Sequence, residues 1–117
     1  MTWEDTVVSL EPQATRAYSD RPAVARQAFV RICTHYFAHA AWLEEGALIR
    51  GAVRLVGIPG VLIHGRLDLS SPLETAWELT QAWPEARLVV VHDAGHLGQG
   101  ATADHVRQAL AEFAEIV

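Results

Sequence analysis

The sequence predicts an α/β fold in which two parallel strands are flanked by helices. Two short apolar runs, residues 61–63 and 88–91, lack any alternation of polar and apolar residues, which is typical of strands covered on both faces. A clearly signalled helix lies between the runs, as a crossover connection between parallel strands requires. Because two strands cannot bury both layers of such a sheet, the chain is expected to be the end of a larger domain.

The first half of the chain is predicted to be mainly helical. Residues 1–21 are rich in turn-forming residues, and a helix is expected from Pro22 to about residue 37, because apolar side chains recur there every three or four positions. These side chains are Val24, Ala28, Phe29, Ile32 and Tyr36. A second helical stretch is expected over residues 43–55. The glycines and proline of residues 57–60 then interrupt the pattern and mark an internal boundary.

The helix between the two strands has a complete start signal. Ser71 is expected at the N-cap, Pro72 at the first helical position and Glu74 at the third, which together form a capping box. Pro84 is expected to end this helix. A last helix is predicted over residues 103–116 because its apolar side chains form one stripe. The stripe consists of Val106, Ala109, Leu110 and Phe113.

Composition and charge are typical of one soluble domain and do not indicate a nucleic-acid or membrane protein. The formal net charge is −5, and the nine cationic side chains, all of them arginine, are scattered along the chain. No stretch approaches the roughly 20 apolar residues that cross a bilayer. One cysteine, Cys33, cannot form an internal disulfide. We therefore expect a cytoplasmic protein with a small-molecule or peptide partner and no cofactor.

Asp68 and His96 are the residues most informative about chemistry. Each follows one of the predicted strands, and the 28 residues between them suffice for a helix, a strand and short connections. Taken singly, Asp68 would be a turn carboxylate or a helix cap, and His96 would be a surface histidine. Together they stand in the order of the last two members of a Ser, Asp, His triad, in which the carboxylate orients an imidazole base. Gly95 is expected to let the second loop turn sharply.

A nucleophile is the missing part of this predicted triad. No G-x-S-x-G elbow occurs in the 117 residues, and none of the four serines has glycines at both flanking positions. The serines are Ser9, Ser19, Ser70 and Ser71. Cys33 lies within a predicted helix, where cysteine is usually a small buried hydrophobe. His64, His92 and His96 do not share a helix face, so no metal site is predicted.

Several motifs in combination carry a resemblance to a known family. They are Trp3-Glu4, Arg31-Ile32-Cys33-Thr34-His35-Tyr36-Phe37, Ile58-Pro59-Gly60-Val61-Leu62-Ile63-His64-Gly65-Arg66-Leu67-Asp68, Pro72-Leu73, Ala76-Trp77, Ala82-Trp83-Pro84 and Ala94-Gly95-His96. With these motifs the chain resembles the C-terminal part of the proline iminopeptidases, α/β-hydrolases that remove N-terminal proline from peptides. The resemblance implies a helical cap-domain segment over residues 1–57 and the C-terminal strand-helix-strand-helix part of an α/β-hydrolase core over residues 58–117.

The resemblance also implies roles for individual residues. Asp68 would be the triad acid and His96 the base, with the serine and the oxyanion donors upstream of Met1. Glu4 matches a cap glutamate that binds the free amine of the substrate, a task for which a carboxylate suits the cationic group. Cys33 stands where the family often has a second glutamate, so it is a weaker substrate-binding candidate and puts amine selectivity in doubt.

Three functional hypotheses follow. The leading one is a fragment of a serine hydrolase whose complete form releases N-terminal proline, the chain alone being inactive. The second keeps the fold and the triad but changes the substrate to an ester or another acyl group. The third is a noncatalytic module that pairs with an N-terminal partner, or with itself, through the exposed sheet edge. In each case the chain is expected to associate with a missing half or with another copy.

Overall fold

The structure, a computed structural model, describes residues 20–96, 98 and 100–115. Its helices are α2 (Ala23–Ala38), α3 (Ala47–Gly51), α4 (Leu73–Ala82) and α5 (Ala101–Ala114), and short 3-10 helices follow as η2 (Ala40–Trp42) and η3 (Ala52–Leu55). The strands are β1 (Gly60–Gly65) and β2 (Ala86–Val91). Within the described residues, none of the helices has both the length and the apolar character that a membrane span needs.

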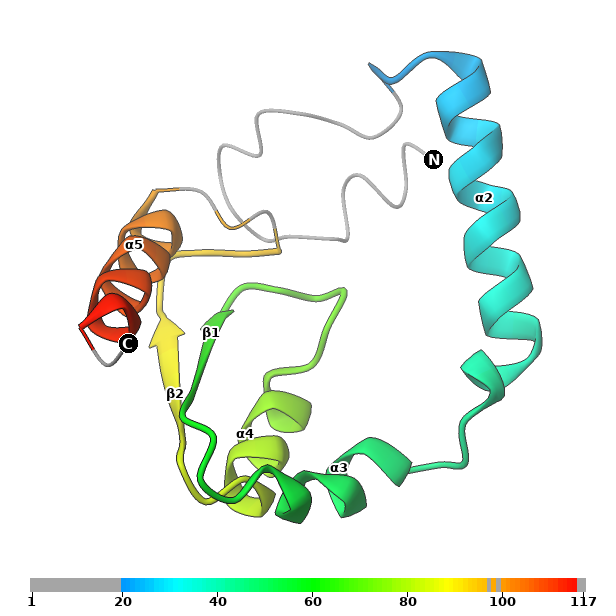
Figure 1. Cartoon of the computed structure of the whole chain (residues 1–117). Coiled ribbons are helices and arrows are strands. Elements are labelled where there is room, and N and C mark those ends of the chain that lie inside the picture. Colours follow the sequence, from blue (N-terminus) through cyan, green and yellow to red (C-terminus); the bar gives the residue numbers. More distant parts are fainter. Residues whose placement is uncertain (1–19, 97, 99, 116–117) are drawn as a thin grey trace.

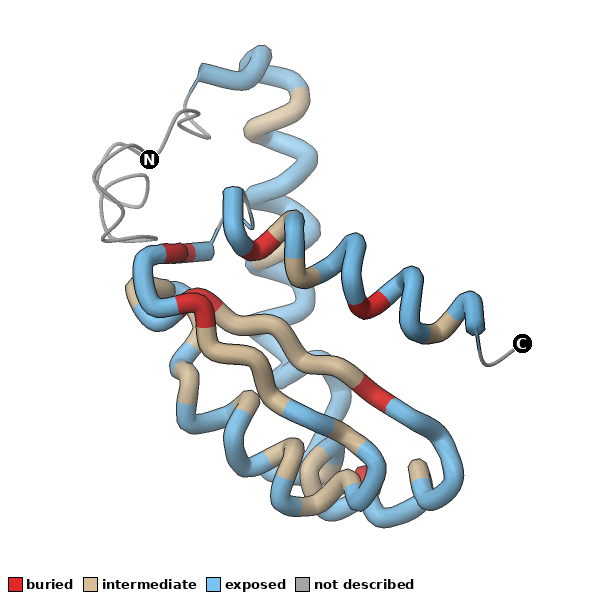
Figure 2. The backbone as a smooth tube through the Cα atoms, turned by 90° about the vertical axis from the view of Figure 1, so that its left-hand side faces the viewer, coloured by how far each residue is buried: buried red, intermediate tan, exposed pale blue. Residues whose placement is uncertain are grey.

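The two strands run parallel and pair without a bulge. Their register runs from Gly60 opposite Ala86 to Gly65 opposite Val91. The crossover helix α4 covers one face of this sheet, and α5 covers the opposite face (Figures 1 and 2). The predicted α/β class, with two parallel strands and flanking helices, is confirmed. Both strands end at the same edge of the sheet, which brings the loops that follow them together.

The described part of the chain has a small core. Its buried apolar residues are mostly small, and none of its large side chains is fully buried. These residues are Ala52, Val91, Ala94 and Ala109. Figure 2 shows the buried positions near the ends of the strands and along α5, whereas most of α2 is exposed. Much apolar surface is therefore left uncovered by the described residues.

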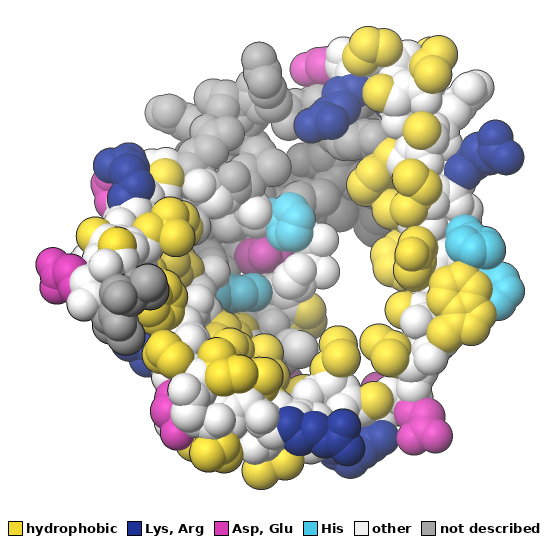
Figure 3. Space-filling model, in the orientation of Figure 1, with side chains coloured by type: hydrophobic (Ala, Val, Ile, Leu, Met, Phe, Trp, Pro, Cys, Tyr) yellow, Lys and Arg dark blue, Asp and Glu magenta, His cyan; other side chains and the backbone are white. Residues whose placement is uncertain are grey.

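Helix α2 begins one residue after Pro22, close to its predicted start. None of its residues is buried, although its sequence has an apolar stripe, and Val24 and Ile32 are 77% and 59% exposed. Among the described elements, α2 packs extensively only against η2. Hydrophobic side chains of α2 border an opening between this helix and the rest of the described chain (Figure 3). The apolar stripe thus correctly predicted a helix, but the described residues leave this stripe exposed.

A strained turn follows α2. Ala40, Ala41 and Trp42 all have positive φ angles, of 46°, 51° and 56°, which residues with a Cβ rarely adopt. The Trp42 amide donates to the carbonyl of His39 at 2.8 Å, and the His39 and Trp42 rings stack with centroids 4.8 Å apart. These contacts hold the turn in its unusual conformation. The helical stretch expected over residues 43–55 is reduced to α3 and η3, which lie against α4.

The structure corrects the predicted start of α4 and shows that only part of the apolar stripe of α5 is buried. The capping box is wrong, because α4 begins at Leu73 and has no side-chain cap hydrogen bond. Pro72 precedes it in an extended conformation, with ψ at 132°, so Ser71 lies too far back to cap the first turn. In α5 the buried residues are Thr102 and Ala109, whereas Val106 and Leu110 of the predicted apolar stripe are 42% and 63% exposed.

Candidate active site

The loops that follow β1 and β2 are joined by backbone hydrogen bonds. The amide of Arg66 donates to the carbonyl of Val91 at 2.9 Å, and the amide of Leu67 donates to the carbonyl of Ala94, also at 2.9 Å. The first of these bonds extends the parallel pairing beyond the last strand residues. The second ties the loop that carries Asp68 to the loop that carries His96.

Gly65 allows this close approach. A Cβ atom at position 65 would lie 2.4 Å from the carbonyl oxygen of Gly95 and 2.5 Å from that of Ala94, closer than real Cβ atoms come to a backbone. Only glycine leaves room for the second loop to cross here. The sequence drew attention to Gly95, but the described glycines of positive φ in this loop are Gly98 and Gly100.

Asp68 and His96 are brought into direct contact. Nδ1 of His96 lies 3.0 Å from Oδ2 of Asp68, within the range of a charge-assisted hydrogen bond. The Asp68 side chain is only 7% exposed, whereas the imidazole of His96 is 43% exposed. The carboxylate is therefore buried between the loops, and part of the imidazole remains accessible to solvent.

The second carboxylate oxygen of Asp68 is held by the loop itself. The backbone amides of Ser70 and Ser71 donate to Oδ1 at 2.8 and 3.0 Å. Burial, the largest single influence, would raise the pKa of Asp68 because it penalises the charge. The hydrogen bond from His96, the two loop amides and the charge of His96 outweigh it and hold this pKa below its ordinary value. Asp68 is thus a carboxylate at neutral pH.

This geometry fixes how His96 uses its two nitrogens. A carboxylate only accepts hydrogen bonds, so Nδ1 of His96 carries the proton that faces Asp68. In the neutral ring Nε2 is then left with a lone pair. An imidazole oriented in this way can accept a proton at Nε2 while the carboxylate stabilises the resulting cation.

The two other predicted site residues are Glu4 and Cys33. Glu4, the expected amine-binding residue, lies outside the described residues. Cys33 is a free thiol of intermediate burial in the middle of α2, away from the strands and their loops (Figure 1). Among the described residues, no serine or cysteine side chain is hydrogen-bonded to His96, and the amides of Ser70 and Ser71 serve Asp68.

Two further histidines near this pair, His92 in the loop after β2 and His64 in β1, contact other groups. Nδ1 of His92 accepts a hydrogen bond from the guanidinium of Arg66 at 3.3 Å. Nε2 of His64 lies 3.0 Å from the carbonyl oxygen of Ser71. No group of three potential ligand side chains within the described residues is arranged to hold a metal ion.

His64, which the sequence suggested only as a possible metal ligand, lies close to Asp68 in the structure. The available signal was a polar residue four positions before Asp68 in an otherwise apolar strand. A polar side chain in such a strand requires a hydrogen-bond partner inside the fold. That requirement would have directed attention to the loop after β1.

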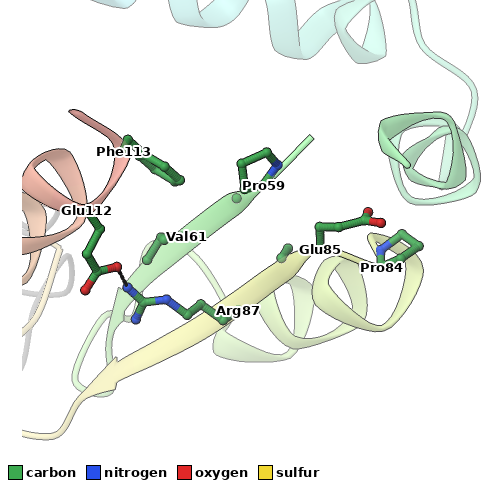
Figure 4. A pocket seen from close by; sticks show the side chains of 9 residues that line it. Pro59, Val61, Pro84, Glu85, Arg87, Glu112 and Phe113 are labelled. Atoms are coloured by element: carbon green, nitrogen blue, oxygen red, sulfur yellow. Dashed lines mark hydrogen bonds and ion pairs between the residues drawn. The ribbon is translucent and has the colours of Figure 1, made fainter. Parts of the chain in front are cut away.

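A concave region lies at the opposite, amino-terminal ends of the strands. This cavity of about 330 Å³ is lined by residues from both strand starts and from α5, among them Pro59, Arg87 and Phe113 (Figure 4). Three charged side chains line it, and two of them, Arg87 of β2 and Glu112 of α5, form an ion pair, while the third is Glu85. The residues that line this cavity do not include Asp68 or His96, so it is separate from the Asp68–His96 pair.

The chain is 49% identical over 70 residues to a proline iminopeptidase of Xylella fastidiosa, a match covering 59% of this chain and 22% of that protein. It is 39% identical over 106 residues to a probable proline iminopeptidase of Streptomyces coelicolor, covering 87% of this chain and 32% of the relative. The proline iminopeptidase of Neisseria gonorrhoeae is 39% identical over 95 residues, covering 80% of this chain and 29% of the relative.

The chain is similar in sequence to the proline iminopeptidases. This confirms the resemblance that the sequence motifs indicated, and the helices and parallel strands agree with part of an α/β-hydrolase fold. No protein-family model matches the chain. The chain spans between about a fifth and a third of the length of the curated relatives that it matches.

Proposed function

We propose that this chain supplies the acid and the base of a serine-hydrolase triad in a proline iminopeptidase. The observation that carries the proposal is the 3.0 Å contact between Nδ1 of His96 and Oδ2 of Asp68 at the carboxyl ends of two parallel strands. The similarity to proline iminopeptidases supports the substrate class, a peptide with an N-terminal proline. The reaction is acyl transfer through a covalent ester intermediate.

In the proposed mechanism, His96 acts first as a base and then as an acid. Nε2 of His96 takes the proton of a serine hydroxyl as its oxygen attacks the prolyl carbonyl, and Asp68 stabilises the cationic ring. His96 then gives this proton to the leaving amine as the peptide bond breaks. Water, deprotonated by His96, attacks the prolyl ester, and the serine oxygen recovers the proton as free proline leaves.

We propose that the nucleophile comes from polypeptide outside these 117 residues. The 117-residue sequence contains no G-x-S-x-G elbow. The exposed apolar side chains of α2 and the unpaired outer edges of the described two-stranded sheet offer surface on which such polypeptide would pack. Under this proposal residues 1–57 belong to a helical cap and residues 58–117 to the hydrolase core.

Substrate recognition is the part of the proposal with a specific competing version. Glu4 would bind the substrate amine by a charge-assisted hydrogen bond. Cys33, however, occupies the position of a family glutamate and has no carboxylate to offer. This substitution favours, as a second candidate, an acyl hydrolase of the same fold that acts on an ester or on a substrate without a free amine.

Complementation tests the proposal directly. The chain would be co-expressed with the nucleophile-bearing remainder of the Streptomyces coelicolor relative, and proline release from a prolyl arylamide would be measured. We expect activity only when both parts are present, and none with His96→Ala. The control is His92→Ala, which changes a histidine in the same loop that does not contact Asp68. Proline release by the chain alone, lost in His96→Ala, would contradict an external nucleophile.

Two further measurements separate the alternatives. Comparing prolyl arylamide with a prolyl ester and an N-blocked ester in the complemented enzyme distinguishes an aminopeptidase from a general acyl hydrolase. A noncatalytic module would associate with the partner yet release no product from any of these substrates. Sedimentation of the purified chain is expected to show self-association through its uncovered apolar surface, and a compact monomer would count against this expectation.

A further inference from the structure

We propose that His64 is a positioning residue for the Asp68–His96 pair, acting through the peptide group of Ser71. The inference deepens the proposed function and rests on it, because it assigns His64 a task in orienting the triad acid. His64 is the fifth of six residues in β1 and pairs with Val90 of β2. Its side chain is 14% exposed, so the imidazole lies largely inside the structure.

The close contacts of the His64 ring are made by its Nε2 atom. Nε2 of His64 lies 3.0 Å from the carbonyl oxygen of Ser71 and 4.0 Å from Oδ2 of Asp68. A carbonyl oxygen only accepts, so Nε2 carries a proton and donates it to Ser71. The distance to Asp68 is too long for a hydrogen bond. His64 therefore acts on the peptide of Ser71 and leaves the Asp68 carboxylate to its other partners.

This places Ser71 under constraint from both sides. Its carbonyl oxygen accepts from His64 in the strand, and its amide donates to Oδ1 of Asp68 at 3.0 Å. With Oδ1 occupied by the amides of Ser70 and Ser71, the carboxylate presents Oδ2 to His96. If Ser71 were released, Asp68 could rotate about its side-chain torsions. The chain of contacts thus runs from β1 through Ser71 and Asp68 to the base.

The loop between His64 and Ser71 makes this connection effective. The hydrogen bond spans seven residues and closes the loop that carries Asp68 back onto the strand from which it emerges. Removing the donor would leave a carbonyl oxygen without its partner in a partly buried site, which is unfavourable. If His64 has a positioning role, its loss should change the tautomer of His96 and the titration of Asp68. A purely structural role predicts only a loss of stability.

The test compares two substitutions of matched length in the full chain. His64→Gln retains a side-chain N–H that can reach the Ser71 carbonyl, and His64→Met has similar size but no donor. The readouts are the imidazole ¹⁵N spectra, which report the tautomer of each histidine, and the ¹³C titration of the Asp68 carboxyl group. Signals are assigned by their loss in His96→Gln and Asp68→Asn. Circular dichroism checks that each variant is folded.

The expected result has three parts. In the wild-type chain, neutral His64 is protonated at Nε2 and neutral His96 at Nδ1. In His64→Met, the Nδ1-protonated form of His96 falls from the major to the minor tautomer, and the Asp68 titration moves upward toward its ordinary range. In His64→Gln, both signals return to their wild-type positions.

Specific outcomes would overturn the inference. An unchanged His96 tautomer in folded His64→Met would show that the N–H donor at position 64 is dispensable. Loss of the Nδ1-protonated His96 tautomer in folded His64→Gln would show that a donor at this position does not suffice. If His64→Met fails to fold, the wild-type spectrum and the His64→Gln variant test the inference. A wild-type His64 protonated only at Nδ1 would contradict the hydrogen bond from Nε2 to the Ser71 carbonyl. These readouts need no nucleophile, so failure of the complementation assay would count against the proposed function alone.

Discussion

Gly65 and Gly95 lie in such close contact that a methyl group on Gly65 would come within 2.4 Å of the Gly95 carbonyl oxygen. Gly65 ends β1, and Gly95 directly precedes His96 in the loop after β2. The contact therefore sets how closely the acid-bearing loop approaches the histidine-bearing loop. The 3.0 Å hydrogen bond between Asp68 and His96 depends on that approach.

Substituting Gly65 by alanine is expected to destabilise the chain and to separate the two loops. The new methyl group would meet backbone atoms, which cannot move aside as the end of a flexible side chain can. Overpacking of this kind typically costs about 1–3 kcal/mol of unfolding free energy. Urea denaturation measures this loss, and the imidazole ¹⁵N spectrum of His96 is expected to change in parallel.

Gly51→Ala is the matched control for this substitution. Gly51 ends α3 with a φ of −77°, and nothing lies within 4 Å of a Cβ built on it. Alanine is therefore expected to leave the stability unchanged or to raise it by up to about 1 kcal/mol. Equal stability losses in the two variants would mean that the Gly65 contact has no special cost.

Acid is expected to remove a stabilising contribution from Asp68. Because the pKa of this carboxyl is lower in the folded chain than its ordinary value of about 3.9, the folded state binds the proton less readily than the unfolded state. The contribution is fully present above the ordinary value and is lost as the pH falls through the lower, folded value. Unfolding free energies measured by urea from about pH 6 down to about pH 2 report the effect.

Asp68→Asn isolates this contribution from those of the other acidic residues. The amide keeps the size of the side chain but does not ionise, so the difference in stability between wild type and variant should narrow as the pH falls. A constant difference over the whole range would contradict a lowered pKa for Asp68. Asp104→Asn, whose side chain is 67% exposed at the surface of α5, serves as the control.

The joint position of Asp68 and His96 could be anticipated from the sequence because it follows from topology. Apolar runs without alternation indicate buried parallel strands, and residues just after such strands meet at one edge of the sheet. The start of α4 could not be anticipated in the same way. Ser71 has the residue type of an N-cap, but its amide is used by Asp68, and Pro72 adopts an extended conformation ahead of the helix.

Whether each apolar stripe is buried could not be predicted from the sequence either. Periodicity reports that one side of a helix is apolar, and it does not report whether a neighbour covers that side. Ile32 of α2 and Leu110 of α5 both lie on predicted stripes, yet they are 59% and 63% exposed among the described residues. Glu4 could be suggested only by resemblance and lies outside the described residues.

The ion pair between Arg87 and Glu112 is expected to contribute little to stability. It joins β2 to α5, but its side chains are 49% and 44% exposed, so water and salt screen the charges. A double-mutant cycle with Arg87→Met and Glu112→Gln is expected to give a coupling free energy below about 1 kcal/mol, decreasing with added salt. A coupling well above this value that persists in high salt would instead make the pair a main attachment of α5 to the sheet.

In the complemented enzyme, Asp68→Asn is expected to lower kcat far more than it changes KM. The amide can present an N–H to His96 in place of an acceptor, which favours the wrong tautomer and removes the charge that stabilises the imidazolium. In the well-studied serine protease triad the equivalent change lowers kcat by about four orders of magnitude. Steady-state kinetics on a prolyl arylamide measure the effect, with Asp93→Asn in the neighbouring loop as the control. Near-wild-type kcat in Asp68→Asn would remove Asp68 from the proposed triad, whatever its contribution to folding.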